Sequence, residues 1–363
     1  MIITGKLIRL PYWLCWQFLR LTGKLHGTVF YLEWMQDYHI VRYILPHITG
    51  PYRIATRNRR LARKLREMGV DAMVWPVFPV TLVMVRHALH RFPIRKIRKI
   101  GLMHGPYFFK KMVRPQRYNA FDLYLFTSEH ALREAVRNGV RSGDVGGYPR
   151  LDAFSDPEVL RLRDRLSTGL SYNKKTILFT ATWDQSGQSA IHKWAGHVES
   201  LKEKYNILVS LHPMMSPDIC AQVRSVDGIL VASQQELYPC MLLADFLVSD
   251  TSSVMAEFCA LDKPVITFSV GRARRLTPKI QSMIREISVQ IDGVEELAGA
   301  IARYDQDPLL LHKNRQRWKQ VMFGEPLDSH GKLAAARINA FIAAQQDSGM
   351  RHSDPGKVHP DTR

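Results

Sequence analysis

The strongest constraint on the fold is the repeated alternation of short apolar runs with helical segments. In the first half, apolar runs at residues 51–57 and 121–128 are each followed by an amphipathic segment, such as the basic segment 58–69. The second half repeats this pattern, with apolar runs at residues 176–182 and 206–213. Strands that alternate with helices in this way form parallel sheets covered by helices on both faces. The sequence therefore predicts an α/β fold.

A polar stretch interrupts this alternation and indicates two domains. Residues 151–174 are charged and carry a single helical patch, which is typical of a connection between domains. We expect two Rossmann-like domains that face a cleft, the first over residues 1–155 and the second over residues 156–345. Residues 346–363 contain almost no apolar side chains and are expected to form a disordered tail.

The chain is strongly basic, with 51 Lys and Arg against 33 Asp and Glu and a formal net charge of +18. Such a surface suits nucleic acid, anionic lipid headgroups or a substrate rich in phosphate. A nucleic-acid-binding protein is the alternative from a different class. Because the basic residues are spread over several predicted helices and no nucleic-acid-binding module is visible, we expect no nucleic-acid partner.

The N-terminal segment points to a membrane surface. Residues 5–27 combine basic side chains with Trp, Phe and several Leu, while the chain has no apolar run of the roughly 18 residues that span a membrane. This composition is typical of a helix that lies in a membrane interface, and the alternative is a first helix packed on its domain. The four scattered cysteines are expected to be reduced, which favours the cytoplasm. We therefore expect a protein at the inner face of the cell membrane, in contact with anionic lipid.

Polar residues follow several predicted strands, where sites lie in parallel α/β folds. His104 and Gly105 follow one apolar run, His212 follows another, and Trp183 follows the run at residues 176–182. A neutral imidazole can take a proton from a hydroxyl or donate a hydrogen bond to a phosphate oxygen. A single His would more often be structural, but two at corresponding strand ends predict that both face the cleft.

Four polar residues in succession, Asp250, Thr251, Ser252 and Ser253, lie between an apolar run and a predicted helix. The first N–H groups of a helix lack partners within the helix, so its N-terminus attracts anions. Helix capping alone needs only one such residue. We therefore predict that these four residues bind phosphate.

Other common enzyme motifs are missing from the sequence. It contains no P-loop, no convincing dinucleotide fingerprint, no HExxH and no nucleophile elbow. It also shows no cluster with the spacing of metal ligands. This argues against a P-loop NTPase, an ordinary dehydrogenase and a zinc hydrolase.

The order of the motifs resembles that of the CDP-glycerol glycerophosphotransferase family, which makes teichoic-acid-like polymers. The resemblance covers about residues 95–340 and rests on MHG, GYPRLD, ILFTATW, LVSLHP, LVSDTSSVMAEFCALDKPVITF and HGKLAAARI. It implies a glycosyltransferase-B architecture, with an acceptor-side first domain and a nucleotide-donor-binding second domain. It also implies transfer of glycerol phosphate from CDP-glycerol to a hydroxyl of a lipid-linked or polymeric glycan acceptor, with release of CMP.

The resemblance assigns roles to individual residues. His104 matches the His of the family's His-Gly motif, a candidate base, and His212 matches the His that contacts the donor phosphates. Ser252 and Ser253, with Thr251 nearby, match the hydroxyl pair that holds the donor diphosphate. Arg150 is expected near the connection between the domains, either at a phosphate or in a surface salt bridge. No cofactor is expected beyond the donor substrate, and a divalent ion at its diphosphate stays open.

Two segments depart from the family pattern. Pro106 replaces the usual Thr after His-Gly, and the loop at residues 269–279 is basic where the family often has an acidic one. The alternatives are therefore a nucleotide-sugar glycosyltransferase and an enzyme like UDP-N-acetylglucosamine 2-epimerase. Such epimerases usually carry Gly-Gly where Ser252 and Ser253 stand. A catalytically silent scaffold with the same fold is a further alternative.

Overall fold

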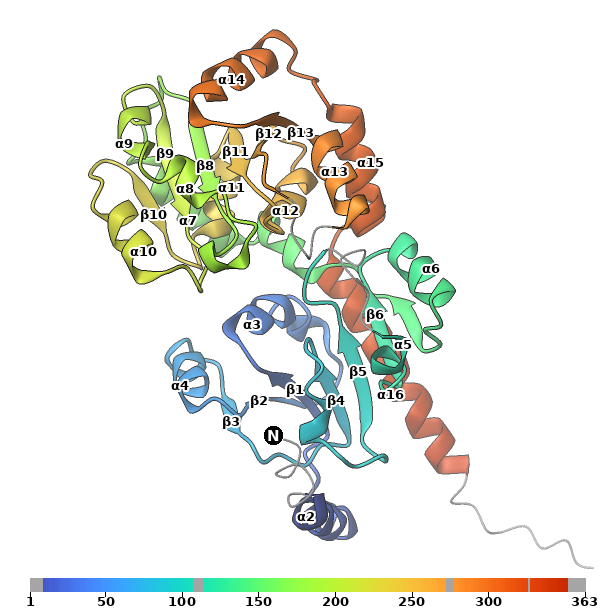
Figure 1. The fold of residues 1–363 in the computed structure, drawn as a ribbon. Helices are drawn as coiled ribbons and strands as arrows, with labels where there is room; N and C mark the ends of the chain where they lie inside the picture. Colours follow the sequence, from blue (N-terminus) through green and yellow to red (C-terminus); the bar gives the residue numbers. More distant parts are fainter. Residues whose placement is uncertain (1–8, 107–113, 272–276, 326, 352–363) are drawn as a thin grey trace, which may run out of the picture.

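Two separate parallel β-sheets form the framework of the protein, as the alternating pattern predicted (Figure 1). The structure, a computed structural model, describes residues 9–106, 114–271, 277–325 and 327–351. Each sheet carries helices on both faces and has the strand order of a doubly wound fold. The fold class expected from the sequence is confirmed.

The first sheet has seven strands in the order β3-β2-β1-β4-β5-β6-β7. Its central strands are apolar because both faces are covered, and every residue of β1 is buried. The strands are β1 (Thr28–Leu32), β2 (Tyr52–Thr56), β3 (Ala72–Val74), β4 (Thr81–Met84), β5 (Arg98–Leu102), β6 (Leu123–Phe126) and β7 (Gly143–Val145).

The helices of the first domain begin at side chains that suit helix starts. Asn58 accepts hydrogen bonds from the N–H groups of Arg60 and Leu61, and Ser128 accepts one from that of Ala131. The helices are α2 (Arg9–Leu21), α3 (Met35–Val41), η1 (Leu45–His47), α4 (Arg59–Glu67), η2 (Leu89–Arg91), α5 (Pro115–Tyr118) and α6 (Glu129–Arg137).

The second sheet has six strands in the order β10-β9-β8-β11-β12-β13. Its strands are β8 (Thr176–Thr180), β9 (Asn206–Ser210), β10 (Leu230–Ala232), β11 (Phe246–Ser249), β12 (Val265–Phe268) and β13 (Ser288–Ile291). The helical elements that lead into and surround it are η3 (Pro149–Ser155), α7 (Pro157–Ser167), η4 (Asp184–Ser186), α8 (Ile191–Trp194), α9 (Val198–Leu201), α10 (Pro217–Arg224), α11 (Leu237–Leu243), α12 (Val254–Ala260), α13 (Pro278–Ile287), η5 (Val294–Glu296), α14 (Leu297–Gln306) and α15 (His312–Phe323).

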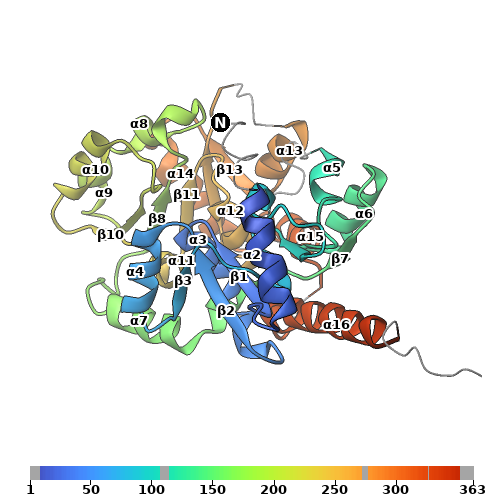
Figure 2. The same cartoon turned by 90° about the horizontal axis from the view of Figure 1, so that it is seen from below.

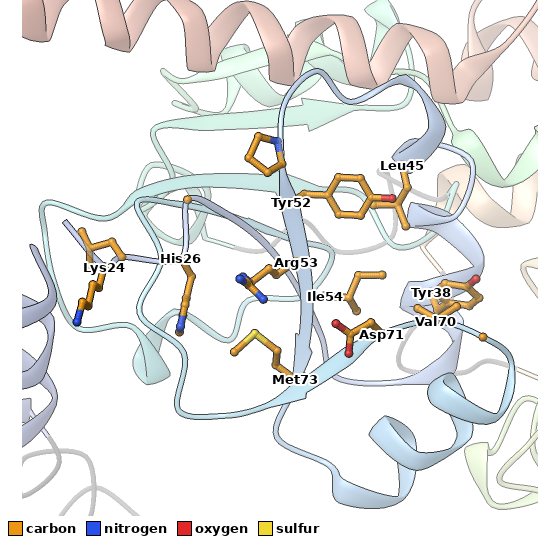
Figure 3. Close-up of a pocket in the computed structure, with 14 residues that line it drawn as sticks. Lys24, His26, Tyr38, Leu45, Tyr52, Arg53, Ile54, Val70, Asp71 and Met73 are labelled. Carbon is orange, nitrogen blue, oxygen red and sulfur yellow. The ribbon is translucent and has the colours of Figure 1, made fainter.

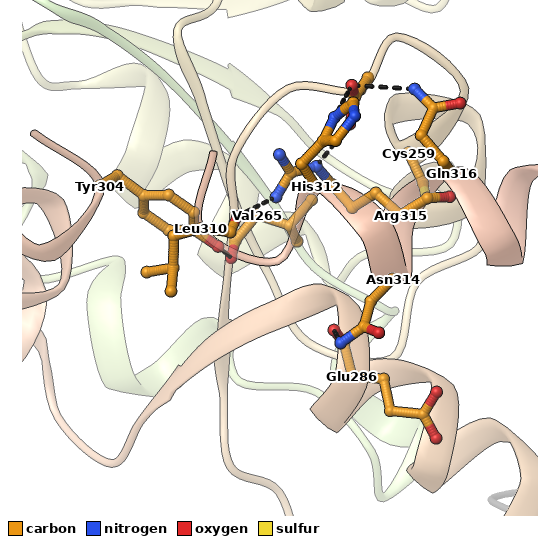
Figure 4. A network of polar contacts seen from close by, with 10 residues as sticks. Cys259, Val265, Glu286, Tyr304, Leu310, His312, Asn314, Arg315 and Gln316 are labelled. Carbon is orange, nitrogen blue, oxygen red and sulfur yellow. Dashed lines mark hydrogen bonds and ion pairs between the residues drawn. The ribbon is translucent and has the colours of Figure 1, made fainter. Parts of the chain in front are cut away.

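A polar network fixes the start of α15 against the turn that follows α12 (Figure 4). The guanidinium of the buried Arg315 donates to Asp262 Oδ1 at 3.0 Å and to the carbonyl of Leu310 at 2.8 Å. His312 and Gln316 contact the other carboxylate oxygen of Asp262. Because a buried guanidinium needs a charged partner, the bond to Asp262 fixes the start of α15. Helix α15 in turn contacts α6 of the first domain, so the network also supports this contact between the domains.

The last helix, α16 (His330–Arg351), returns to the first domain. Its residues Ala334, Ala335 and Ile338 are fully buried in the core formed by β1, β4 and α3. The sequence prediction grouped these residues with the second domain, but the structure packs them on the first sheet (Figure 1). Residues 346–351 of the expected tail continue α16, and residues 352–363 lie outside the described residues.

The motif at residues 147–152 holds α16 in place. Asp152 accepts hydrogen bonds from the N–H groups of His330 and Gly331 and from the Ser329 hydroxyl, all at 2.7–2.8 Å. A Cβ atom at Gly331 would lie 2.0 Å from the carbonyl oxygen of Tyr43. Only glycine permits this close approach, so the helix start is held against both η3 and the segment after α3.

The same motif joins the two domains through a buried ion pair. Arg150 Nη1 lies 3.4 Å from Glu257 Oε1 of α12, and the Tyr148 hydroxyl donates to the same oxygen at 2.7 Å. The Arg150 guanidinium also stacks over the Tyr238 ring of α11 at 5.2 Å. The side chain of Glu257 is only 2% exposed, so this carboxylate depends on the first domain for its partners.

Replacing Glu257 by Ala should strongly destabilise the protein, because it leaves the Arg150 charge buried without its partner. We expect the free energy of unfolding, measured by urea denaturation, to fall by about 3–5 kcal/mol. The matched control is Glu134→Ala, which removes the half-exposed pair with Lys279 and should cost less than about 1 kcal/mol. The double variant Arg150→Met with Glu257→Leu should recover part of the loss. Equal costs for Glu257→Ala and Glu134→Ala would show that the buried Arg150–Glu257 pair is no stronger than the half-exposed Glu134–Lys279 pair, which also links the two domains.

Candidate active site

The two sheets turn their carboxyl ends toward a common cleft between the domains. The cleft has a volume of about 370 Å³ and is lined by residues from both domains. His104 of the first domain and His212, Ser252 and Ser253 of the second domain all line it. The structure therefore brings together four of the residues that the sequence singled out.

His212 is held in one tautomer by its own loop. It follows β9, and its Nδ1 accepts a hydrogen bond from the N–H of Met214 at 3.1 Å. Burial lowers the pKa of His212, so the ring is neutral near pH 7. A neutral ring whose Nδ1 accepts carries its hydrogen on Nε2, which is then a donor for an anionic oxygen.

His104 lies opposite, at the end of the first sheet. It follows β5 and is exposed at the cleft. Gly105 and Trp183 are half-buried and do not belong to the described residues that line the cleft. Of the three residues singled out on these two loops, only His104 reaches it. In the sequence, Pro106 is followed by Tyr107, Phe108, Phe109, Lys110 and Lys111, which lie outside the described part of the chain.

Ser252 and Ser253 stand between β11 and α12 with their side chains at the cleft. Ser253 is the residue before α12, but its side chain makes no capping hydrogen bond. Ser252 Oγ accepts a long bond of 3.4 Å from the N–H of Val254. Helix capping therefore does not explain why two serines stand here, and Ser253 presents its hydroxyl to solvent in the cleft.

Asp250 and Thr251 are not among the described residues that line this cleft but line a separate hollow of about 280 Å³, and their contact with phosphate stays a prediction. The carboxylate of Asp250 is 1% exposed and accepts hydrogen bonds from the backbone N–H groups of Thr182, Ala190, Thr251 and Ser252. The Thr251 hydroxyl lies 3.2 Å from that of Thr182. Burial raises the pKa of Asp250, and the N–H donors oppose this rise. Asp250 therefore shapes the loop that presents the two serines, since its oxygens are occupied inside the protein.

Arg150 lines the floor of the cleft, where its charge is already compensated by Glu257. The sequence left open a phosphate contact or a surface salt bridge. The salt bridge is present but buried, with the Arg150 side chain 16% exposed. Its position makes Arg150 part of both the cleft and the contact between the domains.

Sequence reasoning missed Trp34 and Arg86, which also line the cleft. They follow β1 and β4, two strands that were not predicted. The missed signal was the pair of apolar runs at residues 28–32 and 81–85, each followed by a polar or aromatic side chain.

Within residues 9–106, 114–271, 277–325 and 327–351, no group of three or more His, Cys, Asp or Glu is placed to hold a metal ion. The charges at the cleft are supplied by the side chains described above.

Comparison with known proteins agrees with this geometry. A model of the family described as CDP-Glycerol:Poly(glycerophosphate) glycerophosphotransferase matches residues 107–274. The chain is 25% identical over 285 residues to the teichoic acid poly(ribitol-phosphate) polymerase of Bacillus spizizenii, covering 73% of this chain and 44% of that protein. It is 31% identical over 126 residues to the teichoic acid glycerol-phosphate primase of Bacillus subtilis, covering 34% and 32%. The chain thus spans less than half the length of these relatives.

Solved structures share the fold. The wall teichoic acid polymerase TagF is similar over 90% of each chain, with a TM-score of 0.61 and 16% identity. The UDP-GlcNAc 2-epimerase from Neisseria meningitidis is similar over 87% of this chain and 99% of its own, with a TM-score of 0.58 and 14% identity. The resemblance seen in the motifs is confirmed: over residues 107–274 the chain matches the model of the CDP-glycerol:poly(glycerophosphate) glycerophosphotransferase family, and its sequence is similar to teichoic acid polymerases and primases.

Proposed function

We propose that the protein transfers glycerol phosphate from CDP-glycerol to a hydroxyl of a lipid-linked, teichoic-acid-like acceptor and releases CMP. The observation that carries this proposal is the shared cleft, which His104 enters from one domain and His212, Ser252 and Ser253 from the other. The match to the family model over residues 107–274 and the similarity to teichoic acid polymerases and primases support the choice of donor and acceptor. The proposed reaction uses no cofactor of the protein's own.

The transfer forms one bond to phosphorus and breaks another. The acceptor hydroxyl oxygen attacks the phosphorus that carries glycerol, and the bond from this phosphorus to the bridging oxygen breaks. The electron pair of the broken bond leaves with CMP, and His104 takes the proton of the attacking hydroxyl. A base within hydrogen-bond reach of the nucleophile accelerates such a step by about 10²- to 10⁴-fold.

The second domain stabilises the charge on the diphosphate. Nε2 of His212 and the hydroxyls of Ser252 and Ser253 are the donors proposed to contact its oxygens. Donors that are already oriented need no rearrangement during the reaction, which is why they lower the barrier. The Asp250 carboxylate supports this arrangement because it accepts hydrogen bonds from the N–H groups of Thr182 and Ser252 and so fixes the backbone beside the serines.

We further propose that α2 attaches the protein to the inner face of the membrane. Its inner side packs on the first domain, where the Tyr12 hydroxyl and the Trp16 indole donate to backbone carbonyls. Its outer side exposes a stripe of apolar side chains at the spacing of one helix face. These side chains are Leu10, Trp13, Leu14, Phe18 and Leu21, all at least 44% exposed. None of the described helices is long and apolar enough to cross a membrane.

The surroundings of α2 are basic, which suits anionic lipid. Figures 1 and 2 together place α2 at the end of the first domain that lies farthest from the second domain. A groove of about 950 Å³ at this end of the domain is lined by the basic residues Lys24 and Arg53, with Asp71 also in its lining (Figure 3). Each basic residue near an anionic membrane surface contributes about 1 kcal/mol of attraction. An exposed apolar stripe beside basic side chains therefore favours a lipid surface over another folded protein.

His104→Ala should lower kcat by at least about 100-fold, because the acceptor hydroxyl loses its base. Ser253→Ala should weaken CDP-glycerol binding, by about tenfold for one lost hydrogen bond to a charged oxygen. Both effects are measured with purified protein, CDP-glycerol and a lipid-linked acceptor, by following CMP release.

The matched control is His192→Ala, an exposed histidine that does not line the cleft, and it should keep the normal rate. A normal rate in His104→Ala would remove the proposed base. Turnover of a UDP-sugar without CMP release from CDP-glycerol would contradict the proposed function itself and favour the nucleotide-sugar alternative.

The double variant Leu14→Ser with Phe18→Ser should bind membranes weakly, because both side chains are exposed and each buries apolar surface only in lipid. Co-sedimentation with vesicles containing anionic lipid should fall by at least about tenfold. The control is Leu309→Ser, which removes a 70% exposed leucine from the second domain and should change nothing. Equal sedimentation of all three proteins would show that α2 is only a packing helix.

A further inference from the structure

The carboxyl edge of the first sheet carries a row of side chains that extends beyond the cleft. The neighbouring strands β5, β4, β1 and β2 are followed by His104, Arg86, Trp34 and Arg57, in that spatial order. Adjacent strands lie about 4.8 Å apart, so the row spans roughly 14 Å. It therefore starts at the proposed base, continues along the cleft through Arg86 and Trp34, and ends outside the cleft at Arg57.

Trp34 connects the cleft to a second depression. It lines the cleft together with His104, and it also lines a depression of about 350 Å³ with Arg57, Asn58 and Arg91. Trp34 thus lines both the cleft and the depression. A ligand that leaves the cleft along the first domain passes over this ring into the depression.

The Trp34 ring is exposed but held in place. Its side chain is 55% exposed, and the Arg86 guanidinium lies 5.7 Å from the ring centre. The buried carboxylate of Asp37 accepts from Arg86 Nε at 2.9 Å and from the backbone N–H of Trp34 at 3.1 Å. One buried acid therefore fixes both the backbone under the ring and the cation beside it.

The far end of the row is positively charged. Arg91 is paired with Glu33, whereas Arg57 takes part in none of the ion pairs found among the described residues. Arg57 is exposed and is followed by the exposed Arg59 and Arg60. The depression thus carries one positive charge beyond its own internal pair, which suits a phosphate group.

We propose that this row is an extended acceptor subsite that selects acceptors already carrying a polyol phosphate unit. In this arrangement the terminal hydroxyl of the acceptor lies at His104, and the polyol next to it lies across the face of Trp34. The phosphate attached to that polyol reaches Arg57. The C–H groups of a polyol pack well on an aromatic ring, and the phosphate next to the polyol is an anion. The Trp34 ring followed by the Arg57 guanidinium therefore matches the order of the groups in the acceptor. This inference rests on the proposed function for the identity of the acceptor.

Binding of a soluble oligomer of glycerol phosphate to the full chain tests the subsite without any transfer reaction. Measured by isothermal titration calorimetry, Arg57→Ala and Trp34→Ala should each bind about tenfold more weakly, as expected for one lost charge-assisted contact or one lost aromatic contact. Trp34→Phe keeps an aromatic face and should stay within about threefold of the unchanged protein. Arg63→Ala, which removes an equally exposed charge from α4 outside the depression, is the matched control and should bind normally.

Two results would overturn the subsite. One is unchanged binding in both Arg57→Ala and Trp34→Ala, and the other is an equal loss in Arg63→Ala, which would show attraction by overall charge only. Binding of anionic vesicles should be unaffected by Arg57→Ala, which separates this site from the membrane contact of α2.

Steady-state kinetics separates the subsite from the proposed function. In CMP-release assays, Arg57→Ala should raise KM about tenfold for an acceptor with a phosphate unit, and leave KM for CDP-glycerol and for a phosphate-free acceptor unchanged. If CDP-glycerol is not a donor, the kinetic test fails for every variant while the calorimetric differences remain. If transfer occurs and the acceptor KM does not change, the subsite is wrong and the proposed function stands.

Discussion

The site depends on one buried ion pair, between Arg150 of the first domain and Glu257 of the second. The Glu257 side chain is only 2% exposed, and a buried carboxylate is stable only if it contacts a cation and hydrogen-bond donors. Arg150 and Tyr148 of the first domain provide these contacts. Glu257 lies on α12, the helix that directly follows Ser253. The contact that holds the domains together therefore also sets how far the two serines lie from the first sheet and His104.

Much of the architecture follows from the pattern of the sequence. The apolar runs that became β2, β5, β6, β8, β9 and β11 are recognisable because most residues of these strands, and all of their last three residues, are buried. The runs that became β1 and β4 were overlooked, and with them the two cleft residues that follow them. The return of α16 to the first domain could not be predicted from local pattern, because it depends on the distant residues Asp152 and Tyr43.

The site shows where sequence reasoning reaches its limit. Asp250, Thr251, Ser252 and Ser253 look alike as small polar residues, and the sequence predicted one role for all four. The structure divides them, since Asp250 and Thr251 point into the protein while Ser252 and Ser253 line the cleft. That division depends on Thr182 and Ala190, whose backbone N–H groups take up the carboxylate of Asp250 and which lie about 60 positions earlier in the chain.

The bonds around Asp152 also tie together the two connections between the domains. The chain passes between the domains twice, through η3 and again just before α16, and Asp152 of the first passage is bonded to Ser329, His330 and Gly331 of the second. Because the two passages are bonded to each other at one point, a substitution of Asp152 would loosen both connections between the domains at once.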